Sequence, residues 1–203
     1  DIGTPASALH AYVGLSQATH ARIKNLNLDA VRNAPGVVCV LTASDIPGSP
    51  DIGPVYAGDP LIASDTVEFR GQILFAVAAV SNKAARRAAR LAEIEYEMLP
   101  AVLDSQTGHE LESYVRPMHC QRRGDAKAAI AEAPMKLEGA FQSGGQEQMY
   151  LEGQVSLAIP DEDGKMLVYS STQHPSEGQK LVAEVLNIPL SHVTVQVLSL
   201  IHI

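Results

Sequence analysis

The residues best placed to do chemistry lie in the segment from Ser170 to Pro175, which reads SSTQHP. It follows an alternating stretch, Lys165 to Ser171, that predicts a strand, and it precedes a helix expected to begin near Pro175. A second strand, Val193 to Val197, follows that helix, so the three elements predict one βαβ unit. Ligands of such units bind at the carboxyl ends of the strands, where loop side chains and helix amides converge. Gln173 lies at that junction, and its side-chain amide suits an oxo or phosphate oxygen without adding charge.

A second polar stretch runs from Gly144 to Glu152, and its paired glycines let the backbone bend or approach a ligand closely. Glu147 and Glu152 suggest a carboxylate pair for acid–base chemistry. Their separation is odd, however, so in an extended strand they would face opposite sides. The alternative interpretation is a Gly-Gly bulge that leads into a sheet with one hydrogen-bonded glutamate. The sequence contains no GxSxG elbow, phosphate-binding glycine loop or HExxH helix.

Two further clusters of polar residues have simpler interpretations. Residues 104 to 122 hold several possible metal ligands, but their spacings match no tight ligand set, so we interpret this segment as a linker. These possible ligands are His109, Glu110, Glu112, His119 and Cys120. The acidic run Asp161 to Gly164 lacks the spaced ligands of a calcium loop and predicts a hairpin turn between strands 154–159 and 165–171.

Composition and charge restrict the class of protein. The chain has 203 residues, 46% of them hydrophobic and 19% charged, which is typical of a globular fold with a substantial core. A net charge of −8 argues against nucleic acid or an anionic membrane as the main partner, and no apolar run is long enough to span a bilayer. The two cysteines, Cys39 and Cys120, are far apart without a CxxC spacing. Cys39 lies in an apolar run and is expected to be buried, and a reducing cytoplasm is the simplest compartment.

The remaining periodicity predicts an α/β (α+β) chain. The clearest helix is Asn82 to Glu93, with alanines on one face and Lys83, Arg86, Arg87 and Arg90 largely on the other, which we interpret as a solvated face. Shorter helices are expected at 28–33 and at 124–133, the latter capped by Asp125. Strands are expected at 9–15, 21–28, 37–41, 73–80, 94–97 and 136–143, and 46–60 predicts an ordered loop or turn series.

Beyond these patterns, the chain resembles the molybdopterin-binding subunit of the xanthine oxidase and aldehyde oxidase family. The resemblance runs from Asp1 to about Val197, and its most specific motifs are GGQE with YLE at 144–152 and STQHP at 171–175. Others are LTASDIPG at 41–48, EYE at 95–97, LPAV at 99–102 and RGD at 123–125. The resemblance implies an α/β hammerhead domain over residues 1–104, a linker over 105–122, and the N-terminal part of a molybdopterin-binding domain over 123–203.

The family hydroxylates purines or aldehydes with a water-derived oxygen, so the resemblance implies an oxidoreductase. It implies molybdenum on molybdopterin, in the plain or the cytosine dinucleotide form, with FAD and [2Fe–2S] clusters on a partner subunit or other domains. Gln173 matches the family glutamine that lies beside the molybdenum and hydrogen-bonds an oxygen ligand, so Gln173 is the expected cofactor-binding residue. No catalytic residue is assigned within the chain. A purine such as xanthine, a cytoplasmic location and an oligomeric enzyme are the further expectations.

The chain departs from the family at its end. Residues 198–203, LSLIHI, do not resemble the family's Arg-Met stretch and glycine-rich loop, and they suggest a frame change, a cloning scar or a truncation. The family's substrate-binding glutamate, its arginines and its late general-base glutamate lie beyond this point. The chain alone is therefore expected to be inactive. A non-catalytic α/β module and a subunit of a related aldehyde oxidase remain the alternatives.

Overall fold

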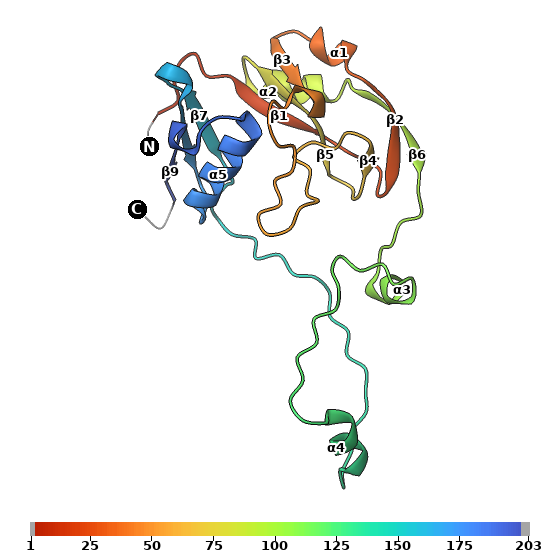
Figure 1. Ribbon diagram of the computed structural model, residues 1–203. Coiled ribbons are helices and arrows are strands. Elements are labelled where there is room, and N and C mark those ends of the chain that lie inside the picture. Colours follow the sequence, from red (N-terminus) through yellow and green to blue (C-terminus); the bar gives the residue numbers. More distant parts are fainter. Residues whose placement is uncertain (1–2, 200–203) are drawn as a thin grey trace. The chain divides into compact units, whose positions relative to one another are not determined.

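The computed structural model describes residues 3–199 (Figure 1). They form two compact units, one of residues up to Ala101 together with those from Glu152 onward, and one of Val102–Leu151. Helices and strands are mixed along the chain, which confirms the predicted α/β class.

The first sheet of the larger unit has the strand order β1-β5-β3. It consists of β1 (His10–Leu15), β5 (Ile73–Ala79) and β3 (Val37–Leu41). Both outer strands pair antiparallel with β5, and Val77 of β5 lies opposite Tyr12 on one side and Val40 on the other. The predicted strands at 9–15, 37–41 and 73–80 are thereby confirmed.

Cys39 is exposed, although the apolar run around it predicted a buried thiol. Among the described strands, β3 pairs only with β5, and the register shifts between Val37 and Cys39. Val38 and Leu41 of the same strand are exposed as well. The prediction was wrong because a continuous apolar run does not show whether both faces of an edge strand are covered.

The second sheet has the order β4-β2-β6 and is antiparallel. Its strands are β4 (Thr66–Val67), β2 (Ala21–Asn27) and β6 (Glu93–Met98). Lys24 of β2 and Glu97 of β6 form an exposed ion pair with an Nζ–Oε2 distance of 2.8 Å, which lowers the pKa of Glu97. The strands predicted near 21–28 and 94–97 are confirmed.

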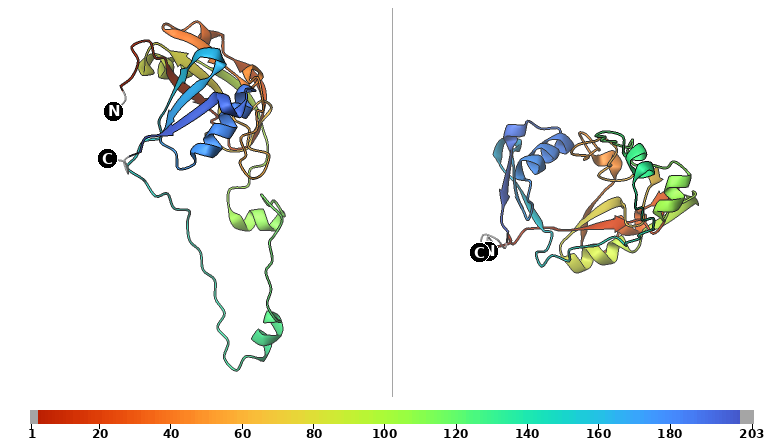
Figure 2. Two further views of the ribbon diagram at one scale, coloured as in Figure 1. Left: turned by 60° about the vertical axis from the view of Figure 1, so that its left-hand side comes forward. Right: turned by 90° about the horizontal axis from the view of Figure 1, so that it is seen from below.

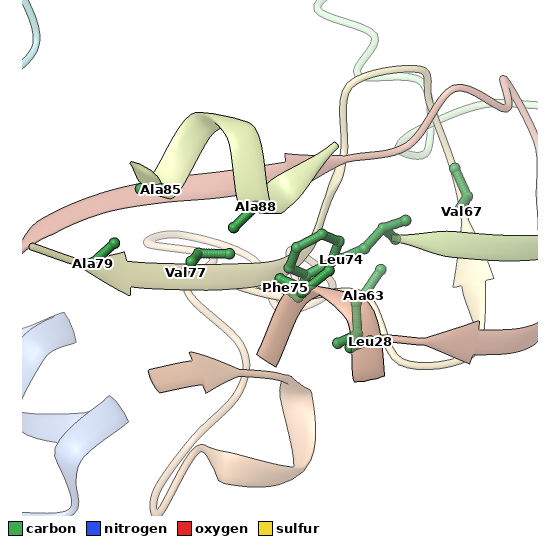
Figure 3. Packing of buried hydrophobic residues seen from close by; sticks show 10 residues of the cluster. Leu28, Ala63, Val67, Leu74, Phe75, Val77, Ala79, Ala85 and Ala88 are labelled. Carbon is green, nitrogen blue, oxygen red and sulfur yellow. The ribbon is translucent and has the colours of Figure 1, made fainter. Parts of the chain in front are cut away.

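The core of this unit lies between β5 and the helix α2 (Asn82–Ala89). Ala85 and Ala88 are buried on the side of α2 that faces β5, where Val77 and Phe75 lie (Figure 3). Small side chains allow the helix backbone to approach the sheet closely. The basic residues of α2 are exposed, as predicted, although the helix ends at Ala89 rather than at Glu93. The short helix α1 (Asp29–Arg32) adds buried Val31 to the core.

Ser81 caps α2, since its Oγ accepts the N–H of Ala84 at 3.2 Å. Replacing Ser81 with alanine should lower the free energy of unfolding by about 1 kcal/mol, because an N-cap acceptor is lost. Ser81→Asn, which keeps an acceptor at the cap, should stay close to the parent. Urea denaturation of the three proteins measures the difference, and equal midpoints for the alanine and parent proteins would contradict it.

The third sheet of the larger unit has the order β7-β8-β9. An antiparallel hairpin joins β7 (Ser156–Pro160) to β8 (Met166–Ser170), with the one-turn helix η2 (Glu162–Gly164) at its tip. The strand β9 (Val193–Val197) is parallel to β8, and α5 (Pro175–Leu186) connects the two and packs beside them (Figures 1 and 2). The predicted βαβ unit and the predicted turn at Asp161 to Gly164 are both confirmed. Two more one-turn helices are η1 (Ala43–Asp45) and η3 (Leu190–His192).

The smaller unit contains the helices α3 (Ser105–Glu110) and α4 (Ala126–Glu132). Asp125 Oδ1 accepts the N–H of Ala128 at 3.0 Å, so the predicted helix and its cap are confirmed. The helix α3 was not predicted from the sequence. Asp104 caps it: its carboxylate accepts the N–H of Thr107, and this hydrogen bond lowers the pKa of Asp104.

The strand predicted at 136–143 is wrong. These described residues form no strand, and Leu137 and Phe141 are 102% and 93% exposed. Their alternation of apolar and polar side chains fits a half-covered strand, but in this unit no neighbouring strand of the described residues pairs with it.

Candidate functional site

Gln173 lies in the short loop between β8 and α5, with an exposed side chain. Ser170, the last residue of β8, is in register with Val197, the last residue of β9, so the loop stands at the shared carboxyl edge of the two parallel strands. No hydrogen bond within residues 3–199 engages the Gln173 amide. Its two N–H donors and its carbonyl acceptor are therefore open to a ligand.

The loop is shaped by its own side chains. Thr172 Oγ1 accepts the N–H of His174 at 3.2 Å, which closes a tight turn around Gln173. Pro175 then occupies the first helical position, where its fixed φ favours helix initiation. His174 stands at the N-cap but its side chain makes no capping bond, so N–H groups of the first turn of α5 stay open beside Gln173.

The opposite end of α5 is held by the loop that follows β3. The N–H groups of Gly48 and Ser49 donate to the carbonyls of Val185 and Glu184 at 3.0 and 2.9 Å. The last carbonyls of a helix lack partners within the helix, so this loop satisfies two of them. Asn187 at the C-cap has φ 54°, and Ile188 N–H reaches Ala183 O at 3.0 Å, which completes a Schellman-type ending.

An apolar cavity of about 520 Å³ lies between α5, the third sheet and the loop after β3. Leu181 and Val185 of α5, Val168 of β8, and Ile52 and Leu61 of the loop line it. Gln173 is not among the lining residues. Ser170 and Thr172, at the start of the loop that carries the polar site, do line it, so the cavity belongs to the packing around α5 and adjoins that loop.

Asp51 organises the loop that lines this cavity. Its carboxylate accepts N–H groups from Gly53 at 2.8 Å, Gly58 at 2.6 Å and Asp59 at 3.3 Å. The Gly53 N–H has the largest effect on the pKa of Asp51, which falls below its ordinary value of 3.8. The Pro, Gly and Asp content of 46–60 predicted an ordered loop here, but nothing in the sequence singled out Asp51 as its centre.

The lowered pKa of Asp51 predicts how the loop responds to acid. Because its folded-state pKa is depressed, the stabilisation is fully present above the ordinary value of 3.8 and is lost as the pH falls through the lower folded-state pKa. The amide proton shift of Gly58, followed by NMR from about pH 6 to about pH 2, should titrate below 3.8. Asp51→Asn should abolish that titration, whereas a midpoint at or above 3.8 in the parent would contradict the prediction.

The other candidate groups of the sequence do not assemble into sites. Among the described residues no three His, Cys, Asp or Glu side chains come together as a metal-binding group. His109 Nδ1 instead pairs with the Tyr114 hydroxyl at 2.8 Å. Glu152 Oε2 accepts a hydrogen bond from Ser199 Oγ at 2.8 Å, and the described residues 143–152 form no strand. No described helix is long and apolar enough to cross a membrane.

Two family models match the chain. Residues 1–100 match the a/b hammerhead domain of aldehyde oxidase and xanthine dehydrogenase, and residues 107–200 match the molybdopterin cofactor-binding domain. Together they span nearly the whole chain in the order that the resemblance implied. The chain belongs to the aldehyde oxidase and xanthine dehydrogenase family.

Individual relatives agree with the family models. The chain is 35% identical over 189 residues to xanthine dehydrogenase/oxidase of Gallus gallus, an alignment that covers 92% of this chain and 14% of that protein. It is 33% identical over 205 residues to xanthine dehydrogenase of Emericella nidulans, covering 97% of this chain and 15% of that protein. The chain thus spans about one seventh of the length of these relatives.

Solved structures show the same fold. The aldehyde oxidoreductase from Desulfovibrio gigas superimposes with a TM-score of 0.83 at 22% identity, covering 96% of this chain and 23% of that chain. Quinoline 2-oxidoreductase from Pseudomonas putida 86 gives 0.79 at 24% identity, covering 96% of this chain and 27% of that chain.

The loop at Gln173 fits the cofactor that this family implies. The cofactor presents oxygen atoms, and the loop offers neutral N–H donors from the open Gln173 amide and from the uncapped first turn of α5. None of the side chains from Ser170 to Gln173 is charged. The donor set therefore suits hydrogen bonding to oxygen rather than direct ligation of a metal ion.

Proposed function

We propose that the chain is part of the molybdenum-binding subunit of a xanthine dehydrogenase, which hydroxylates xanthine or hypoxanthine with a water-derived oxygen. The observation that carries the proposal is the exposed Gln173 amide, which bonds no described residue, at the carboxyl edge of β8 and β9, in a chain about one third identical to xanthine dehydrogenases. Binding at this edge is the general rule for parallel strands joined by a helix.

In this proposal Gln173 binds the molybdenum cofactor. Its side-chain N–H would donate to an oxygen atom of the cofactor, and the turn closed by Thr172 and His174 would hold the amide in place. The cofactor, when bound, supplies the redox chemistry of hydroxylation, and the protein supplies orientation. The chain provides positioning groups only, since no general base is assigned within it.

The proposal extends to domain limits and partners. Residues 1–104 would form the hammerhead domain, 105–122 a linker and 123–203 the N-terminal part of the cofactor domain. Of the atypical segment 198–203, residues 200–203 lie outside the described residues. FAD and [2Fe–2S] clusters would lie on a partner subunit or other domains, within a cytoplasmic oligomer that acts on a small purine.

The test uses the longest natural polypeptide that contains this sequence, purified from its own host. We expect molybdenum in near-stoichiometric amount and turnover of xanthine faster than that of a simple aldehyde. Faster turnover of the aldehyde would instead indicate a subunit of an aldehyde oxidase. A metal-free polypeptide that turns over neither would support the non-catalytic module and overturn the proposal.

A further inference from the structure

We propose that Ser171 is a positioning residue for Gln173: its hydroxyl clamps the start of β7 to the end of β8 and so fixes the backbone from which Gln173 projects. The inference rests on the proposed cofactor-binding role of Gln173. It assigns a task to a side chain two positions away from Gln173.

The clamp is a set of hydrogen bonds centred on one oxygen. Ser171 Oγ accepts the N–H of Val155 at 3.0 Å and donates to the carbonyl of Gly153 at 2.9 Å. The backbone N–H of Ser171 donates to Val155 O at 3.1 Å. These bonds join residues 153–155 to Ser171, with Val155 O as a second, longer acceptor for the hydroxyl at 3.4 Å, beyond Ser156↔Ser170, the last paired position of the β7–β8 ladder.

The neighbouring serine makes a different contact. Ser170 Oγ bonds the hydroxyl of Ser156 at 2.8 Å, a side-chain pair across two strands that the backbone ladder already holds in register. Removal of the Ser170 hydroxyl leaves that ladder intact. Removal of the Ser171 hydroxyl instead releases both the Val155 N–H and the Gly153 carbonyl, where no regular ladder continues.

The two ends of the Gln173 loop are therefore fixed by different hydroxyls. Ser171 holds the strand side, and Thr172 Oγ1 holds the helix side through the N–H of His174. Gln173 lies between these points with no hydrogen bond from its side chain to a described residue. Its position then depends on how firmly the two ends are held, because the side chain itself is unanchored.

The clamp has little to do with global stability. Val155 is 69% exposed, so water can replace the lost partner of its N–H when the hydroxyl is removed. What changes is the freedom of the backbone at the carboxyl end of β8. A small displacement of a positioning group is enough to slow an enzyme, whereas a water-compensated surface hydrogen bond hardly alters unfolding.

The experiment compares Ser171→Ala with Ser171→Thr, which keeps the hydroxyl, and with Ser170→Ala, which removes the neighbouring one. In the 203-residue chain, amide hydrogen exchange at Val155 should accelerate in Ser171→Ala only. In the longest natural polypeptide, Ser171→Ala should lower kcat about tenfold at an unchanged KM, and Ser171→Thr should restore it.

The outcomes separate this inference from the proposed function. If Gln173→Ala slows turnover but Ser171→Ala behaves like Ser170→Ala in both exchange and kcat, the positioning role is wrong while the cofactor site stands. If Gln173→Ala leaves turnover unchanged, the cofactor site itself is wrong, and the positioning role falls with it.

Discussion

Replacing Gly48 with alanine should lower the free energy of unfolding of the larger unit by about 1–3 kcal/mol. A Cβ at this position would lie 2.0 Å from the carbonyl oxygen of Glu184 and 2.9 Å from Val185 O and Asn187 N. All three are backbone atoms at the end of α5, and they cannot rotate away as a flexible side chain would. The loop would have to withdraw and give up its hydrogen bonds to the last carbonyls of the helix.

The matched control is Gly178→Ala in α5 itself. Apart from the neighbouring backbone of the helix itself, a Cβ at Gly178 would meet no atom within 4 Å, and the residue lies inside the helix. Alanine there should raise the stability by about 0.5–1 kcal/mol, because glycine loses more backbone entropy on helix formation. Thermal or urea unfolding of both variants gives the comparison. Equal stabilities for the two would mean that the Gly48 loop does not dock on α5 in solution.

The sequence predicted the elements around the site because their signals are local. Alternation from Lys165 onward, Pro175 at the helix start and the β-branched run at Val193 each act within a few residues, and the structure has β8, α5 and β9 there. The position of Gln173 at the carboxyl edge follows from that order of elements alone. Its role at the cofactor came from the motif and stays a prediction.

The contacts that hold the site could not be predicted because they join residues far apart in sequence. Gly48 contacts Glu184 and Val185 only once the fold is formed, and the LTASDIPG segment does not indicate which residues it will contact. The same limit explains the error over 136–143. Alternation at Leu137 and Phe141 describes side chains that suit a sheet, whereas strand formation needs a second strand that supplies hydrogen bonds.

Taken together, the contacts hold α5 independently at its two ends. Backbone amides of Gly48 and Ser49 hold its carboxyl end, and the turn of Thr172 and His174 defines its amino end. A substitution at the first end should act through stability, since it disturbs backbone packing. A substitution of Gln173 at the second end should act through function, since its side chain is exposed.

Gln173→Ala should slow turnover by about 10²-fold in the longest natural polypeptide that contains this sequence, with unfolding changed by less than about 0.5 kcal/mol. The rate loss is expected because removing one positioned N–H donor from an oxygen that gains charge in the reaction typically costs about 10²–10³ in kcat. Stability should hardly change because the side chain is exposed and bonds no described residue. Steady-state kinetics with xanthine and a urea titration measure the two effects.

Two further variants separate hydrogen bonding from shape. Gln173→Glu keeps the size of the side chain but replaces two donors with a negative charge, so it should be at least as slow as Gln173→Ala. Gln196→Ala removes another exposed glutamine, from β9 and outside the loop, and should retain the parent rate. If Gln173→Glu were as active as the parent, the side-chain N–H donors of Gln173 would not be the groups that bind the cofactor oxygen. Unchanged kinetics in Gln173→Ala would remove Gln173 from the site altogether.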